Sequence, residues 1–244
     1  MKRNFTSTRS VEIRPINGSQ DGGEELELPL FAINWIDTRS SKLYATYLGL
    51  AARLVRKIEA TPVFKANTKE TLAGSESLAR ELLLIVRYPT ATGFLSLLVS
   101  RTFQLVSTLR ITAVRSFSFV FNKRFDQGPD QSLGAEDQPI PFKNGSQYAA
   151  LMYTADGEIA DEWSILRDAA DSSAVSVDFF CGPAASLVLL RTGAEERPIP
   201  YVTDRVAILS AESVEALERF AASGLERALG GARDFWVGRM ERSI

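Results

Sequence analysis

The sequence predicts an α+β protein made of two βαββαβ units in tandem. Two blocks, residues 28–125 and 147–244, show the same order of strand and helix patterns. A stretch rich in Gly, Pro, Asp and Gln at 126–146 separates them, and its turn chemistry is typical of a linker. The composition, 45% hydrophobic and 24% charged, is that of ordinary globular domains. Residues 1–27 precede any periodic pattern and are expected to form a flexible segment.

The first block alternates between the two periodicities of regular structure. An aromatic and β-branched run at 29–36 predicts a strand. Apolar residues then recur at three- and four-residue steps over 43–58, which predicts a helix that ends before Pro62. Ser40 or Ser41 can cap its start. The later elements predicted in this block are strands at 63–66 and 82–88, a helical region at 94–106 and a strand at 114–121.

The second block repeats this order with little obvious sequence identity. Its predicted elements are strands at 148–153, 175–180, 185–191, 205–210 and 234–240, with helices at 161–170 and 213–229. A βαββαβ unit is ferredoxin-like, an antiparallel sheet with both helices on one face. The other face of each sheet must also be covered, and the sheet of the other unit is the nearest cover.

The sequence contains no histidine and one cysteine. Imidazole is the usual general base and metal ligand near neutral pH, so Ser-His-Asp and Cys-His catalysis, histidine-ligated zinc and a proximal-histidine haem are excluded. Tyr or Cys remain as ligands that could hold a haem. Cys181 has no partner for an internal disulfide and no histidine to activate it. Glycine-rich phosphate loops are absent too, so we expect no metal and no cofactor.

Charge is unevenly divided between the two halves of the chain. Residues 1–125 carry 18 Lys and Arg against 10 Asp and Glu, whereas residues 126–244 carry 10 against 20. The halves should therefore attract each other. The cations of the first half are dispersed, without a Lys/Arg cluster or an RNP-like aromatic motif, so no nucleic-acid partner is expected.

Nothing near the N-terminus resembles a secretion signal. Residues 1–10 are basic but run into polar residues without an apolar core. The longest apolar runs, such as 82–86, fall far short of the roughly 18 residues that suggest a membrane span. We expect a soluble cytoplasmic protein with no membrane partner.

Several short features of the first block resemble a bacterial domain family of unknown function within the dimeric α+β barrel superfamily. The resemblance covers roughly residues 28–124 and rests on Asn34, Tyr47, Arg87-Tyr88-Pro89-Thr90, Phe103 and Arg110. It implies that the two units form an intramolecular dimeric α+β barrel, with a pocket between the sheet and the helices of each unit. Superfamily members include cofactor-independent monooxygenases, polyketide cyclases, lactone isomerases and haem enzymes related to chlorite dismutase. Where such families supply a histidine near the second helix, this chain has Leu109.

The first unit has the richer set of polar residues for such a pocket. The candidate substrate-binding residues are Asn34, Tyr44, Tyr47, Arg87, Tyr88 and Arg110. Arginines in a cleft can hold a carboxylate or enolate, and a tyrosine can donate to a developing oxyanion. The same arginines could equally form structural ion pairs, with the tyrosines packed in the core. No catalytic residue is assigned.

Two classes of function stay open at this point. One is an enzyme or binding protein that takes a small hydrophobic molecule, anionic or bearing a carbonyl group, without a cofactor. The other is a non-catalytic stress-type or assembly scaffold, which could also form homo-oligomers. The first requires an open cavity in the first unit, whereas the second predicts that large side chains fill it.

Overall fold

The computed structural model of the chain describes residues 11–14, 29–124, 142, 145–154, 162–183, 186–189, 205–229 and 233–243. The first unit consists of β2 (Leu30–Thr38), α1 (Ser41–Val55), η2 (Arg56–Ile58), β3 (Thr61–Gly74), η3 (Glu76–Leu78), β4 (Leu82–Tyr88), α2 (Ala91–Val99), α3 (Arg101–Ala113) and β5 (Val114–Arg124). The second consists of β6 (Gln147–Thr154), α4 (Glu162–Ser172), β7 (Val175–Pro183), β9 (Arg205–Ala211), α5 (Val214–Ala221), α6 (Leu225–Ala228) and β10 (Arg233–Arg242). The predicted βαββαβ order is confirmed in both units.

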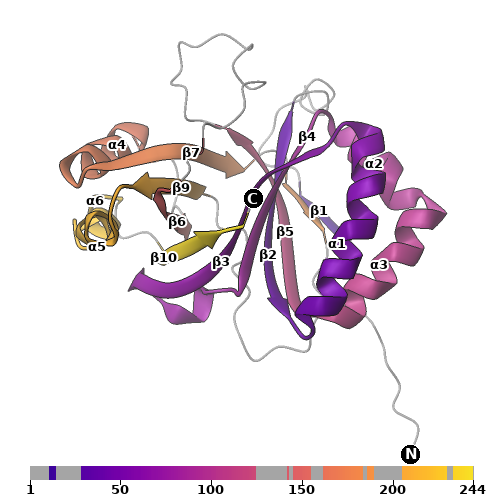
Figure 1. Cartoon of the computed structure of the whole chain (residues 1–244). Coiled ribbons are helices and arrows are strands. Elements are labelled where there is room, and N and C mark those ends of the chain that lie inside the picture. The colour runs from indigo at the N-terminus through magenta and orange to yellow at the C-terminus, as the bar shows by residue number, and fades with distance from the viewer. Residues whose placement is uncertain are drawn as a thin grey trace, which may run out of the picture.

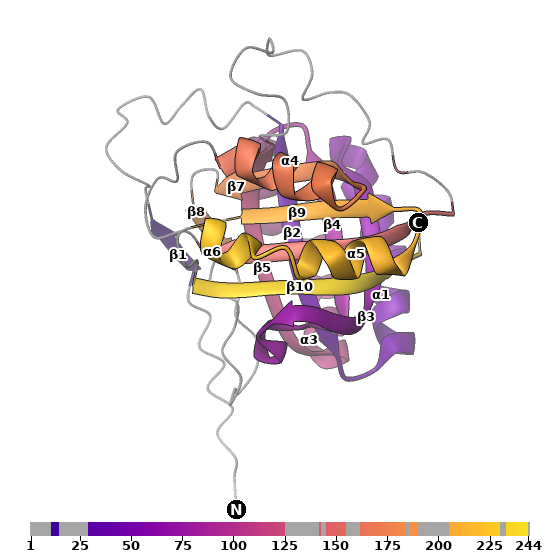
Figure 2. The same cartoon turned by 90° about the vertical axis from the view of Figure 1, so that its left-hand side faces the viewer.

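Each unit is an antiparallel sheet with its helices on one face (Figure 1). The strand order is β3-β4-β2-β5 in the first unit and β7-β9-β6-β10 in the second. This is the ferredoxin-like order, as the sequence predicts. Figure 2 shows α4, α5 and α6 lying over the outer side of the second sheet.

The edge strands of the two sheets pair with each other and close one eight-stranded barrel. β3 pairs with β10, from Gly74 opposite Trp236 to Ala66 opposite Arg242. On the other side, β5 pairs with β7 over a short stretch, residues 122–124 opposite 181–183. The inner faces of both sheets therefore enclose a single core, and the prediction that each sheet covers the other is confirmed.

Large side chains from both units fill the inside of the barrel. Phe31 meets Phe179 edge to face, with 5.1 Å between ring centroids. Trp35 meets Trp236 in the same way at 5.7 Å. The indole nitrogen of Trp236 donates to Oγ1 of Thr71 at 3.0 Å. Because each of these contacts joins one unit to the other, the two units share the apolar core inside the barrel.

β3 is much longer than the strand predicted at 63–66, since it runs from Thr61 to Gly74. Its second half carries exposed polar residues such as Lys69 and Glu70, and it has no apolar alternation that a sequence pattern could reveal. Pairing with β10, a strand from the far end of the chain, supplies the backbone hydrogen bonds that extend it. The length of this strand is therefore set by a long-range contact.

The helical region predicted at 94–106 is two helices. Ser100 has an extended backbone that ends α2, and its Oγ accepts a hydrogen bond from the backbone N–H of Phe103 at 3.2 Å, which caps α3. Ser40, one of the two predicted caps, serves α1 in the same way. Of the helices that the structure describes, none combines the length and the apolar character needed to cross a bilayer.

One strand predicted in the second block lies outside the barrel. The prediction at 185–191 corresponds to β8 (Ser186–Leu189), which pairs with β1 (Val11–Arg14) in a separate two-stranded sheet. β1 falls within residues 1–27, where the sequence shows no periodic pattern. The pairing joins segments that are far apart along the chain, which explains why no local signal marks it.

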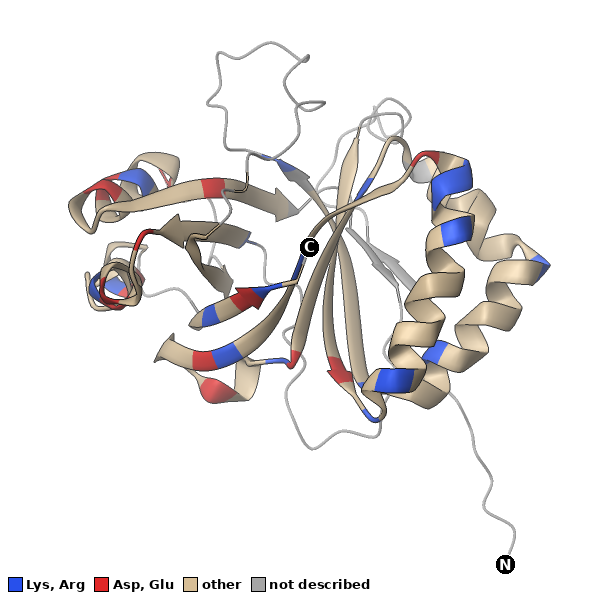
Figure 3. Ribbon diagram, in the orientation of Figure 1, with Lys and Arg blue, Asp and Glu red and all other residues tan. Residues whose placement is uncertain are grey.

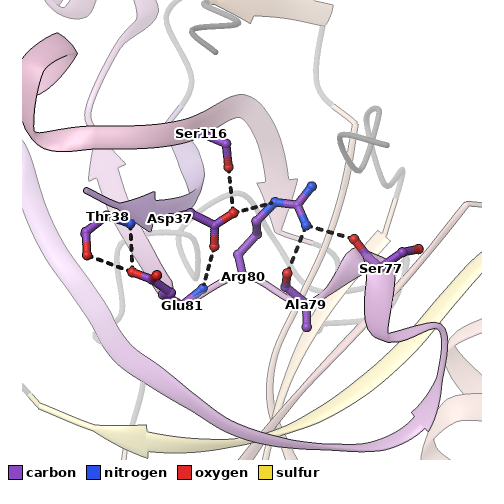
Figure 4. Close-up of polar contacts among 7 residues, drawn as sticks. All are labelled: Asp37, Thr38, Ser77, Ala79, Arg80, Glu81 and Ser116. Atoms are coloured by element: carbon purple, nitrogen blue, oxygen red, sulfur yellow. Dashed lines mark hydrogen bonds and ion pairs between the residues drawn. The ribbon is translucent and has the colours of Figure 1, made fainter. Parts of the chain in front are cut away.

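A buried ion pair fixes the end of the first sheet (Figure 4). Oδ2 of Asp37 lies 3.5 Å from Nε of Arg80, with side-chain exposures of 9% and 2%. The same carboxylate accepts from Oγ of Ser116 at 2.8 Å and from the backbone N–H of Glu81 at 3.0 Å. Nη1 of Arg80 also donates to the backbone carbonyls of Ser77, within η3, at 2.9 Å and of Ala79, just after it, at 2.8 Å. The cluster thus ties the end of β2 to β5 and to the β3–β4 connection.

Removing Asp37 should be costly, because it leaves the Arg80 guanidinium buried without its carboxylate. We expect Asp37→Ala to lower the free energy of unfolding by about 3–5 kcal/mol. Lys69→Ala is the matched control, since Lys69 forms an exposed ion pair with Glu241, with side-chain exposures of 43% and 61%. That change should cost less than about 1 kcal/mol. Urea unfolding followed by circular dichroism measures both, and equal losses would contradict the structural role of the cluster.

Two glycines differ in the space that an added side chain would find, and Gly49 serves as the control for Gly238. A Cβ added at Gly238 would lie 2.0 Å from Cζ2 of Trp236, whose side chain is fully buried and cannot move aside. Gly238→Ala should therefore lower the free energy of unfolding by at least about 1–3 kcal/mol. Gly49, on α1, has no neighbour within 4 Å of an added Cβ. Gly49→Ala should leave stability unchanged or raise it by up to about 1 kcal/mol. Thermal unfolding measures the stability of both variants. A Gly238→Ala protein as stable as the wild-type chain would be incompatible with the packing of Trp236.

Candidate functional site

A cavity of about 400 Å³ lies in the first unit, between α1 and the outer face of the sheet. Strand alternation directs Leu84, Val86 and Tyr88 of β4 toward the helices. From α1, Tyr44 and Tyr47 reach the cavity from one face of the helix, with Ala51 one turn further on. The exposed lining residues, Gly49, Ala52, Arg56 and Pro62, mark its opening.

Seven of the described aromatic side chains line the cavity. They are Tyr44, Tyr47, Tyr88, Phe94, Phe103, Phe117 and Phe119. Phe94 stacks on Phe119 with 5.1 Å between centroids, and Tyr88 meets Phe94 edge to face at 5.0 Å. These contacts fix the rings against one another, so the wall is a preformed apolar surface.

Arg110 is the buried cation of the cavity. It lies in the last turn of α3 and is only 7% exposed. Its guanidinium carbon is 4.6 Å from the ring centroid of Phe117 and 5.9 Å from that of Tyr47. Arg56 and Lys65 also line the cavity, whereas none of the lining residues that the structure describes is Asp or Glu. The cavity is therefore positively charged as well as apolar.

The three tyrosines of the cavity keep their protons. Burial raises the pKa of Tyr44 and of Tyr88, and the nearby Tyr47 raises both further, against a smaller opposing effect of Arg110. Burial also raises the pKa of Tyr47, although Arg110 opposes the shift by its charge and its hydrogen bond. All three hydroxyls are thus hydrogen-bond donors near neutral pH, and none is a base.

Asn34 contributes an acceptor to the same cavity. Its Nδ2 donates to the carbonyl oxygens of Ala32 at 3.1 Å and Leu84 at 3.0 Å. Both amide hydrogens are used in this way, which orients the carbonyl oxygen Oδ1 as the group that a ligand can meet. Donors from the tyrosines and Arg110 therefore face a single amide acceptor.

Arg87 does not line the cavity, although it is one of the six candidate residues. Successive residues of β4 point to opposite faces, and Leu84, Val86 and Tyr88 occupy the face toward the helices. Arg87 lies on the face of Leu83 and Ile85, toward the barrel interior. The other five candidates, Asn34, Tyr44, Tyr47, Tyr88 and Arg110, are among the lining residues.

Two cations at the cavity, Arg56 and Lys65, were not predicted as site residues. Lys65 follows Phe64 and precedes Ala66, both buried inside the barrel, so alternation along β3 turns it to the outer face. Arg56 begins η2 and its Nε donates to the carbonyl of Ala52. Strand alternation could have found Lys65, but a position just beyond a helix end carries no such signal.

In the corresponding layer of the second unit, the described residues include large side chains packed between the helices and the sheet. Leu166, Leu217 and Phe220, from α4 and α5, are fully buried against the sheet. Oε1 of Glu162 accepts from the Tyr153 hydroxyl, and Arg205 holds the same carboxylate through Nε at 2.9 and 3.0 Å. These three polar side chains satisfy one another.

The residues of the cavity do not fit a haem. Of the side chains that ligate haem iron, tyrosine alone occurs among the described lining residues, and the raised pKa values oppose the tyrosinate that would bind iron. Within the described ranges no cluster of three or more His, Cys, Asp or Glu side chains could hold a metal ion.

No family model and no curated protein matches the sequence. Similar solved structures include an RPA0582 protein of unknown function from Rhodopseudomonas palustris, at 15% identity and a TM-score of 0.37, covering 44% of this chain and 94% of that one. An anthrone oxidase-like protein matches at 8% identity and a TM-score of 0.44, covering 90% and 94%. A variant of chlorite dismutase from Candidatus Nitrospira defluvii matches at 9% identity and a TM-score of 0.44, covering 90% and 94%.

The strand order around the closed barrel decides the fold independently of these matches. The chain has the dimeric α+β barrel fold. Its two units lie in one chain, so the barrel is intramolecular. At the identities and TM-scores found, the matches carry no information on ligand or reaction.

The buried tyrosines should make the barrel sensitive to alkali. Their pKa values are raised in the folded chain above the ordinary value of 10.0, so the unfolded chain loses these protons first as the pH rises. The stabilisation is fully present below pH 10 and declines above it, by about 1.4 kcal/mol per pH unit for each such tyrosine.

A Tyr44→Phe/Tyr88→Phe double variant should show a shallower decline, by up to about 2.7 kcal/mol per pH unit. Urea unfolding between about pH 9 and pH 11.5 measures the slope, and each protein's stability at pH 7 is its own reference. Identical slopes for the double variant and the wild-type chain would show that these hydroxyls do not stay protonated in the folded state.

Proposed function

We propose that the chain binds a small, largely apolar molecule carrying one anionic or carbonyl group, in the cavity of the first unit and without a cofactor. The observation that carries this proposal is Arg110, a buried cation whose neighbours are aromatic rings, in a cavity whose described lining residues include no Asp or Glu. A buried charge without a counterion is costly, and an anionic ligand would offset that cost. The aromatic wall would hold the apolar body of the same molecule.

The arrangement favours binding over proton abstraction. Arg110 and the Tyr47 hydroxyl can stabilise negative charge on a bound carbonyl oxygen. Removal of a proton from the ligand needs a base, but the cavity-lining residues within the described part of the chain include no Asp or Glu, and the sequence has no histidine. The tyrosines are protonated, so they cannot serve either.

The alternative, a scaffold without a ligand, predicts a filled layer between helices and sheet. The second unit has that character, with fully buried side chains between its helices and its sheet. The open cavity of the first unit therefore supports the binding function for this unit.

Two fluorescent probes that differ by one charged group test the proposal. 8-Anilinonaphthalene-1-sulfonate is an aromatic anion, and N-phenyl-1-naphthylamine is the same framework without the sulfonate. We expect Arg110→Met to weaken binding of the anion by at least about tenfold, because a hydrogen bond to a charged partner contributes roughly 1.5–3 kcal/mol. Binding of the neutral probe should change little.

Two further variants complete the test. Arg87→Met removes the same charge from the other face of β4 and should leave the affinity for both probes unchanged. Ala52→Trp places a large ring at the opening and should weaken both probes together. Circular dichroism checks that each variant is folded. Equal affinity of the anionic probe for the wild-type chain and a folded Arg110→Met variant would rule out the cavity as an anion site and favour the scaffold.

A further inference from the structure

The outer surface of the helices of the first unit is basic and carries exposed apolar side chains. No acidic residue occurs between Asp37 and Glu59 or between Glu81 and Asp126, and these two stretches include all of α1, α2 and α3. Figure 3 shows the blue of Lys and Arg on these helices. Five exposed cations lie on this layer: Lys42, Arg53, Arg56, Lys57 and Arg101.

The exposed apolar residues gather on the same helices. In the part of the chain that the structure describes, the large apolar side chains that are exposed are Leu50, Leu95, Val99, Leu105 and Ile111. Val99 and Leu105 stand out at 74% and 71% exposure, on either side of the break between α2 and α3. Single exposed apolar residues are ordinary, but here all five lie on one helical layer that contains no acidic residue.

Helical spacing brings the two kinds of side chain together. On α1 and the turn after it, Lys42, Leu50, Arg53 and Lys57 follow steps that keep them on one stripe. On α3, Arg101 and Leu105 are one turn apart. α1 and α3 pack against each other in the layer (Figure 1). We call the surface formed by the five exposed cations and the five exposed apolar residues the basic helical face.

We propose that the basic helical face binds the surface of an anionic lipid bilayer. Such a surface offers negative charge to the cations and an acyl boundary to Val99 and Leu105, whereas the helices do not enter the bilayer as spans. The proposal revises the expectation of no membrane partner, which rests on the absence of a spanning segment. It does not depend on what the cavity binds.

A second copy of the chain fits this face less well. Two basic helical faces brought together would repel each other. The helices of the second unit are acidic, with Glu162, Asp168, Glu215 and Glu226 among their residues, but none of the exposed large apolar residues lies on them. They would match the charge of the basic helical face and leave Val99 and Leu105 without an apolar partner. A bilayer supplies both the negative charge and the apolar contact.

Vesicle sedimentation of the full chain tests the proposal. We expect binding to phosphatidylcholine vesicles that contain roughly 30% phosphatidylserine, no binding to pure phosphatidylcholine, and release at about 1 M salt, where charges are screened within about 3 Å. Arg53→Glu/Arg101→Glu should weaken binding at least about tenfold. Val99→Ser/Leu105→Ser should weaken it severalfold without changing the net charge.

The matched control reverses two exposed arginines of the second unit, Arg167→Glu/Arg227→Glu, and should bind the vesicles like the wild-type chain. An equal loss in this control would reduce the effect to net charge and overturn the proposal. So would an absence of binding to the anionic vesicles. Light scattering on the same samples detects self-association, and a dimer that the Arg53→Glu/Arg101→Glu change dissociates, without vesicle binding, would assign the face to a second copy instead.

Discussion

Pairing between the edge strands of the two units is the interaction on which the rest of the structure depends. Each ferredoxin-like sheet has two unpaired edges and one face that its helices leave uncovered. The pairing of β3 with β10 and of β5 with β7 satisfies the edges, and the same closure turns the uncovered faces toward each other. The two sides are unequal, because β3 and β10 pair over most of their length whereas β5 and β7 meet only near their ends. Trp236 lies beside the longer of the two and joins its backbone pairing to the shared core.

Closure of the barrel also positions the cavity. Because the inside of the barrel is filled by residues from both units, each sheet can carry a second, separate apolar layer on its outer side. In the second unit this outer layer is closed by well-packed side chains and by the Glu162–Arg205 ion pair. In the first unit, the buried Arg110 and the rings around it leave a space instead. The candidate site is thus a local departure from close packing on a sheet that the barrel core already holds in place.

Much of this architecture is readable from the sequence, because its signals are local. The apolar steps of α1, the cap at Ser40 and the alternation along β5 are each set by nearby residues, and their elements are found where the patterns predict them. β3 shows the limit, since its polar second half becomes a strand only through a partner more than 160 residues away. The pairing of β1 with β8 is of the same kind.

The candidate site was also predictable in part. Five of its polar residues come from motif and helix position, and strand alternation alone separates Tyr88 from Arg87 once the face covered by the helices is known. Among the described residues, the absence of acidic side chains around Arg110 is a property of the assembled wall, to which eight separate elements contribute. No single segment of sequence could reveal it.

The location of both units in one chain has a consequence for how each can change. In a barrel assembled from two identical chains, every substitution appears twice, so a residue that opens space in one layer opens it in the other as well. Here the layer around Arg110 and the layer around Phe220 belong to different stretches of sequence and can change independently. The first unit can therefore carry a buried charge and an incompletely filled interior while the second remains closely packed. In a covalent tandem of this kind the two units can therefore take on different properties, which a symmetric pair of identical chains cannot do.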